Sequence, residues 1–150
     1  MLALTQKTGY ALIAMSHLAG LEDGQVACSR GIAESCGAAV SLMMNVLKEL
    51  AAAGYVESVR GAHGGYRLVK NPEEINLADL IEVMEGPIRL AECMNDQADD
   101  NAECTCQAMA RCPVTDPVHR AQRKLSDFLR KVTLSELLDG EPVLPIDQKR

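Results

Sequence analysis

Four cysteines lie close together in the second half of the chain. They are Cys93, Cys104, Cys106 and Cys112, with the spacing C-x10-C-x-C-x5-C. Thiolates bind soft metals and iron–sulfur clusters, and a polar loop can wrap around such a group. The spacing matches neither a standard zinc finger nor a standard ferredoxin. The four residues therefore predict a thiolate site, and an iron–sulfur cluster, zinc and a thiol–disulfide switch all stay open.

The other two cysteines, Cys28 and Cys36, lie far upstream in apolar helical patterns. We expect them to be small buried core residues. The first ten residues do not form a signal peptide, and no run of apolar residues reaches the roughly 18 that a membrane span needs. The sequence therefore predicts a cytoplasmic protein, in which thiols stay reduced and clustered cysteines more often bind a metal.

Length and composition favour one domain with an appended element. The chain has 150 residues, of which 47% are hydrophobic, with no Trp and one Phe, so its core must be aliphatic. The net charge is −6, but residues 1–72 carry +1 and residues 73–150 carry −7. The acidity thus belongs to the second half, and a local basic patch in the first half would suffice for nucleic acid.

The first third of the chain has the apolar spacing of helices. Three are predicted, over about 5–20, 30–36 and 41–53. The segment 21–24 ends the first helix, with Gly24 as its expected cap, Ser29 precedes the second helix, and Ser41 is the expected N-cap of the third. A short helix and a longer one joined by a tight turn containing glycine form a helix-turn-helix pattern.

Two short strands follow directly. Residues 55–60 and 66–70 alternate apolar with polar side chains around the glycine-rich tip 61–65, which predicts a β-hairpin. A hairpin placed directly after a helix-turn-helix is a wing. The pair of motifs indicates a winged helix-turn-helix that binds double-stranded DNA.

Candidate DNA contacts follow from this arrangement. On the third helix they are Ser41, Met44, Asn45 and Lys48, which can reach base edges or phosphates in a major groove. On the wing they are Arg60, His63 and Arg67, and Arg60 could enter a narrow minor groove. The wing glycines would permit positive φ or a close approach of the backbone to a phosphate.

The second half contains a short helix over 78–85, the cysteine loop over 91–114 and a long helix over 117–131. Asp116 and Pro117 form a typical helix start, and Thr133 to Glu136 resembles a capping box. The long helix carries a narrow apolar stripe made of Val118, Ala121, Leu125, Phe128 and Val132. Such a stripe resembles a coiled-coil seam and predicts a homodimer.

The motif Arg60-Gly61-x-x-Gly64-Gly65-Tyr66-x-Leu68, together with the order of elements, resembles the Rrf2 family of bacterial transcription regulators. The resemblance covers about residues 1–140 and is closest to the branch that regulates iron–sulfur assembly operons of the SUF or ISC kind. It implies a dimeric winged-helix protein. Many members sense iron–sulfur status, nitric oxide or redox state through a [2Fe-2S] or [4Fe-4S] cluster.

The resemblance also implies a ligand set. Cys93, Cys106 and Cys112 fit the three cysteines usual in the family's loop. The assembly regulators add a His where this chain has Thr115, and other members add an Asp where it has Gly9. Cys104 is the obvious substitute for the fourth ligand.

The sequence thus predicts a mainly α protein with a small β-hairpin and no enzymatic activity. Residues 1–72 are the expected winged helix-turn-helix DNA-binding domain, and residues 73–150 the expected linker helix, cluster-binding loop and dimerisation helix. The predicted function is transcription regulation through a cysteine-ligated iron–sulfur cluster, acting on iron–sulfur assembly or redox and nitric oxide response genes. One alternative is a DNA-binding regulator with zinc or a disulfide in the loop. The other is an iron–sulfur carrier or electron-transfer protein, which would not need a helix-turn-helix.

Overall fold

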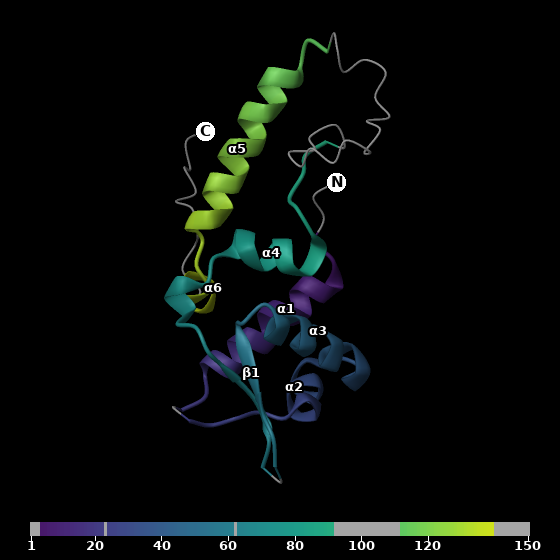
Figure 1. The fold of residues 1–150 in the computed structure, drawn as a ribbon, viewed down its shortest axis with the longest axis vertical. Coiled ribbons are helices and arrows are strands. Elements are labelled where there is room, and N and C mark those ends of the chain that lie inside the picture. The colour runs from purple at the N-terminus through teal and green to yellow at the C-terminus, as the bar shows by residue number, and fades with distance from the viewer. Residues whose placement is uncertain (1–3, 23, 62, 92–111, 140–150) are drawn as a thin grey trace, which may run out of the picture.

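A computed structural model describes residues 4–22, 24–61, 63–91 and 112–139. The elements run α1 (Gln6–Ala19), α2 (Ser29–Cys36), α3 (Val40–Ala52), β1 (Val56–Val59), β2 (Gly65–Leu68), the 3₁₀ turn η1 (Pro72–Glu74), α4 (Leu77–Glu85), α5 (Thr115–Lys131) and α6 (Leu134–Leu138). The helices α1 to α3 and the hairpin form one body, and α4 lies across it. The long helix α5 extends away from this body (Figure 1). The predicted mainly helical fold with one hairpin is confirmed.

The main core is aliphatic, as the composition predicts. Helices α1 and α3 meet through fully buried side chains such as Met15, Met43 and Leu47, because these residues recur on one face at helical spacing. Ile75 and Leu134 belong to the same cluster, so the core extends across position 72 into the second half of the chain. A smaller cluster joins α4 to the C-terminal half of α5.

The hairpin is antiparallel, with Val56 opposite Leu68 and Val59 opposite Gly65. A further bridge pairs Tyr66 of β2 with Ala27, in the loop before α2. The Ala27 N–H donates to the Tyr66 carbonyl at 3.0 Å, and the Tyr66 N–H donates to the Ala27 carbonyl at 2.8 Å. The wing is therefore hydrogen-bonded to the helix-turn-helix.

The end of α5 is also fixed to the body. The Leu77 N–H donates to the Val132 carbonyl and the Leu134 N–H donates to the Ile75 carbonyl, each at 2.8 Å. Thr133 then opens α6 with the predicted capping box, in which its hydroxyl accepts from the Glu136 N–H. The C-terminal end of α5 thus joins the start of α4.

Several helix boundaries differ from the predicted ones by one or two residues. Helix α1 ends at Ala19 with Gly20 as its C-cap, so the predicted cap at Gly24 is wrong. Helix α2 begins at Ser29 itself, and its N-cap is Cys28, whose Sγ accepts from the Gly31 N–H at 3.3 Å. Cys28 is exposed, so the prediction that it is a buried core residue is wrong. It lies at the N-cap because a thiol can accept a hydrogen bond at a helix start much as a hydroxyl does. Cys36 is half-buried against the main core.

Two further N-cap predictions are also wrong. Helix α3 begins at Val40 with Ala39 as N-cap, so Ser41 lies inside the first turn and caps nothing. Helix α5 begins at Thr115 with Val114 as N-cap, so Asp116 lies in the first turn, where its charge still favours the helix start. Neither N-cap residue has a side chain that could accept a hydrogen bond, and tertiary packing must define both starts.

Candidate nucleic-acid interface and cysteine segment

Helix α3 presents one polar face to solvent. Its opposite face is buried through Met43, Val46, Leu47 and Leu50. The predicted contact residues Ser41, Met44, Asn45 and Lys48 are all exposed. They share one face because steps of three and four residues return to the same side of a helix. The structure therefore brings these four predicted residues together on a surface that a DNA groove could reach.

The wing residues are exposed as well, but they differ in their partners. Arg60 and His63 lie beyond the end of β1, at the tip of the hairpin. Arg67 lies opposite Glu57 in the register, and its Nε donates to the Glu57 Oε1 in an ion pair across the hairpin. An Arg67 contact with DNA would therefore have to compete with Glu57, whereas no described residue forms an ion pair with Arg60.

The wing glycines have structural roles within the hairpin, and the predicted positive φ is found at one of them. Gly61 has φ of 129°, a conformation that side chains disfavour. A Cβ at Gly64 would collide with the carbonyl oxygen of Val59, and a Cβ at Gly65 would lie 2.5 Å from the carbonyl oxygen of Ala27. At these two positions glycine lets two backbone segments of the protein approach each other closely. The predicted approach to a phosphate is therefore not needed to explain why glycine occupies them.

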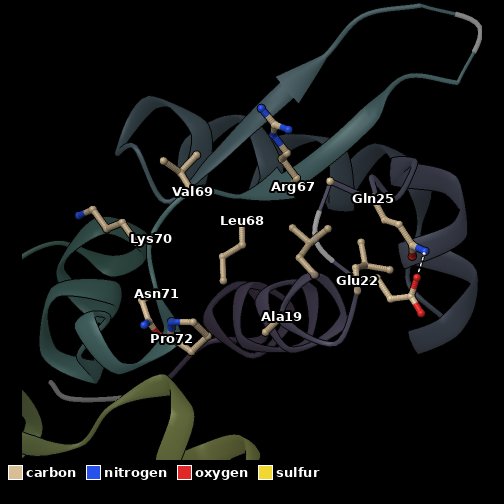
Figure 2. Close-up of a pocket in the computed structure, with 12 residues that line it drawn as sticks. Ala19, Glu22, Gln25, Arg67, Leu68, Val69, Lys70, Asn71 and Pro72 are labelled. Atoms are coloured by element: carbon tan, nitrogen blue, oxygen red, sulfur yellow. Dashed lines mark hydrogen bonds between the residues drawn. The ribbon is translucent and has the colours of Figure 1, made fainter.

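A hollow of about 320 Å³ lies between the C-terminal end of α1, the loop after it and β2. Figure 2 shows Leu68 pointing into this space, with Ala19 on the helix beneath, while Arg67 points the opposite way. This alternation is that of a strand. It directs the Arg67 guanidinium to the outer face of the hairpin.

One further candidate for a DNA contact, Arg30, was not predicted from the sequence. Arg30 is exposed in the first turn of α2, the first helix of the helix-turn-helix. In proteins of this architecture the first helix crosses the DNA backbone while the second enters the groove. A positive charge at that place is the signal that sequence reasoning could have used.

Of the four predicted thiolate ligands, the structure describes only Cys112. Cys93, Cys104 and Cys106 lie outside the described residues. Cys112 is half-buried just before α5, and its carbonyl oxygen accepts from the Thr115 hydroxyl at 3.2 Å. Hydrogen bonds from the Thr115 side chain and the Val114 backbone hold the pKa of the Cys112 thiol below its ordinary value. A thiolate at this position suits metal ligation.

The described ranges hold no group of three or more His, Cys, Asp or Glu side chains that could bind a metal ion. They also hold no helix with the length and apolarity to cross a membrane. The predicted metal site therefore depends on the cysteines between positions 92 and 111.

The apolar stripe of α5 is partly used within the chain. Val132 is buried, and Leu125 and Phe128 pack against the cluster formed by α4 and Leu129. In contrast, Ala121 is exposed and Val118 is half-buried, in the half of the helix that extends from the body (Figure 1). Only the N-terminal part of the stripe is therefore left uncovered by the described chain for the predicted homodimer contact.

Helices α2 and α3, together with the hairpin that is hydrogen-bonded to the loop before α2, define a winged helix-turn-helix protein. The sequence profile of the Rrf2 family, described as an iron-dependent transcriptional regulator, matches residues 4–140. The chain belongs to the Rrf2 family. It is therefore a DNA-binding transcription regulator, and this membership confirms the prediction that it is not an enzyme.

Individual relatives agree with this family. The chain is 31% identical to the HTH-type transcriptional regulator NsrR of Bacillus licheniformis over 135 residues, which are 90% of this chain and 91% of that protein. Its fold is similar to that of CymR, the global cysteine regulator of B. subtilis, with a TM-score of 0.71, 27% identity and coverage of 95% and 100% of the two chains. IscR of T. potens is also similar, with a TM-score of 0.67, 26% identity and coverage of 99% and 94%.

Proposed function

We propose that this regulator binds its operator with an affinity controlled by an iron–sulfur cluster held by Cys93, Cys104, Cys106 and Cys112. The observation that carries the proposal is the position of Cys112, which is half-buried directly before the start of α5 and ends the segment that contains the other three cysteines. The family's iron dependence and the similarity to NsrR and IscR support it. The target genes would be those of iron–sulfur assembly or of redox and nitric oxide responses.

The geometry indicates how such a site could act on DNA binding. The segment between α4 and α5 connects two helices whose other ends are joined, since the Val132 carbonyl accepts from the Leu77 N–H and the Leu134 N–H donates to the Ile75 carbonyl. A cluster supplies thiolate–metal bonds that cross-link the segment, and metal binding of this kind couples to local folding. Ordering or loosening of the segment would therefore shift α5 relative to the DNA-binding helices.

We propose a functional division of the chain at about residue 72. Residues 1–72 supply the DNA contacts, from Ser41, Met44, Asn45 and Lys48 on α3 and from Arg60, His63 and Arg67 on the wing. Residues 73–150 supply the cluster ligands and the dimer interface. Residues on both sides of this position share one hydrophobic core, so a movement in one part can be transmitted to the other.

Anaerobic reconstitution of single Ser variants tests the cluster. Variants at Cys93, Cys106 and Cys112 should lose the thiolate-to-iron absorption, and Cys104→Ser should lose or alter it, because each removes one ligand. Cys28→Ser is the matched control, since Cys28 caps α2 and should leave the absorption unchanged. Full absorption in Cys112→Ser would reject the site. A colourless wild type that contains zinc, or that gains a disulfide on oxidation, would favour the alternatives.

A further inference from the structure

The wing strand β2 has one edge that the described part of the chain pairs only in part. Tyr66 exchanges both of its backbone hydrogen bonds with Ala27, so its N–H and carbonyl point away from β1. Val69 points the other way, since its N–H donates to the Tyr55 carbonyl at 2.9 Å. Backbone groups alternate in direction along an antiparallel strand. Leu68, two residues after Tyr66, therefore directs its N–H and carbonyl away from β1, and no hydrogen bond from a described residue reaches them.

This edge opens into the hollow of about 320 Å³ between α1, the loop after it and β2. In a longer antiparallel pairing with β2, Gln25 would lie opposite Leu68, as Ala27 lies opposite Tyr66. The loop instead bends away, and the Gln25 N–H donates to the Glu22 carbonyl at 3.0 Å. Gln25 and Leu68 both line the hollow, which thus takes the place of the missing pairing (Figure 2).

The base of the hollow is apolar. Leu21, Leu68 and Pro72 line it and are half-buried, and Leu18 of α1 lies buried beneath them. The volume is at the lower end of the range for ligand sites. An aliphatic side chain placed in the hollow would remove this apolar surface from water.

The charged side chains around the hollow already have partners. The Lys70 Nζ lies 4.4 Å from the centre of a tyrosine ring. Arg67 is paired with Glu57 on the outer face of the hairpin, and the Glu22 carboxylate accepts from the Gln25 side chain at 3.0 Å. The hollow is left with one backbone N–H, one backbone carbonyl and apolar side chains. These groups fit a neutral ligand that carries a peptide unit beside an aliphatic side chain, and they do not select for an ion.

We propose that the hollow binds a short extended peptide of a partner protein, which adds to the edge of β2 as a further strand. One peptide residue exchanges two hydrogen bonds with the backbone of Leu68, and its aliphatic side chain packs against Leu21 and Leu68. Strand addition of this kind takes affinity from backbone bonds and specificity from the pocket beneath alternate side chains. Arg67 points to the opposite face of the hairpin, so the peptide leaves the proposed DNA contacts of the wing accessible.

The probe is the peptide acetyl-Thr-Leu-Thr-Val-amide, titrated into the full-length protein and followed by nuclear magnetic resonance of the backbone amides. We expect saturable shifts centred on Leu68 and Gln25. Hydrogen exchange of the Leu68 N–H should slow, while that of Val69, which is already bonded to Tyr55, should not change. Methylation of the leucine nitrogen in the peptide removes its donor and should weaken binding at least about fivefold.

Variants of the protein test whether the side chain of the peptide enters the hollow. Ala19→Leu places a larger side chain at the lining position on α1 and should weaken binding at least as much as the methylated peptide does. Ala52→Leu is the matched control, because Ala52 is an exposed alanine that also ends a helix, and it should bind as the wild type does.

Four results would overturn the proposal. They are the absence of saturable shifts, shifts centred away from β2, equal affinity for the methylated peptide, and unchanged affinity in a folded Ala19→Leu. Circular dichroism checks the fold of each variant. If Ala19→Leu does not fold, the methylated peptide still decides, since it is tested on the wild-type protein.

Discussion

At Gly65, the absence of a side chain decides how the wing meets the helix-turn-helix. Its backbone lies against Ala27, so that Tyr66 can exchange two hydrogen bonds with that residue. A methyl group there would push the strand away from the loop before α2. The residue at position 65 therefore controls how closely the wing packs against the loop before α2.

We expect Gly65→Ala to lower the free energy of unfolding by about 1–3 kcal/mol, as overpacking against backbone typically does. DNA affinity should fall as well, because the wing is displaced. Urea denaturation and a fluorescence anisotropy titration measure the two effects. Gly9→Ala is the matched control, because no atom lies within 4 Å of its Cβ position inside α1. That change should stabilise by about 0.5–1 kcal/mol. Equal effects of the two substitutions would contradict this account.

Arg60 and Arg67 should differ in their contribution to DNA binding. Arg60→Ala should reduce the slope of log affinity against log salt by about 1, the value for one phosphate contact. Arg67→Ala should have a smaller effect, since Arg67 is paired with Glu57 in the free protein. Operator titrations at several salt concentrations measure both. Lys131→Ala, at the end of α5, serves as control. Unchanged affinity of Arg60→Ala at moderate salt would remove the wing tip from the interface.

At the scale of elements, the end of α4 is hydrogen-bonded to the start of α1. The carboxylate of Glu85 accepts from the Thr5 N–H at 3.2 Å and from the hydroxyls of Thr5 and Thr8. Lys7 donates to the Met84 carbonyl at 3.0 Å and forms an ion pair with Glu49 of α3 at 2.7 Å. Through Lys7, α4 is thus connected with α3, the helix that carries the proposed DNA contacts.

This carboxylate predicts a pH dependence. Hydrogen bonds from the Thr5 and Thr8 side chains hold the pKa of the Glu85 carboxyl below its ordinary value. A group whose folded-state pKa is lowered adds stability above its unfolded pKa, and that stability is lost as pH falls through the folded value. We expect Glu85→Gln to be less stable than the wild type at neutral pH, and the difference to shrink as the pH falls below the ordinary pKa of a glutamate. Urea midpoints measure it. Glu34→Gln on α2 is the control, and a constant gap between Glu85→Gln and wild type across this range would refute the role of the charge.

At the scale of the whole molecule, we propose that two copies pair through the N-terminal half of α5. A dimer would give two α3 helices and two wings, related by a two-fold axis and suited to two half-sites. Leu125 and Phe128 already pack on α4, so a charge there would disturb folding as well as pairing. Ala121 is exposed, so a charge at this position should affect pairing without disturbing the fold.

We expect Ala121→Arg to give monomers, because two arginines would have to enter the same narrow seam. Sedimentation or light scattering measures the mass, and circular dichroism checks the fold. Ala52→Arg, at an exposed alanine at the end of α3, should stay dimeric. A folded, dimeric Ala121→Arg would place the interface elsewhere.

The sequence by itself determined the order of the elements. Helical spacing predicted α1, α3, α4 and α5, and alternation around Gly61–Gly65 predicted the hairpin, because these signals act between residues a few positions apart. The polar face of α3 and the capping box at Thr133 followed from the same local rules. Helix starts were less predictable, since Ala39 and Val114 cap nothing with their side chains.

Tertiary structure alone decided the contacts between distant segments. Glu85 and Thr8 lie 77 residues apart, and Gln122 and Ile88 lie 34 apart. Arg67 looked like an available cation until the register placed Glu57 opposite it. Gly65 looked like a residue for phosphate approach until Ala27 was found against it. In each case the side chain's role depends on which partner the fold brings near, and no local preference of the chain encodes that partner.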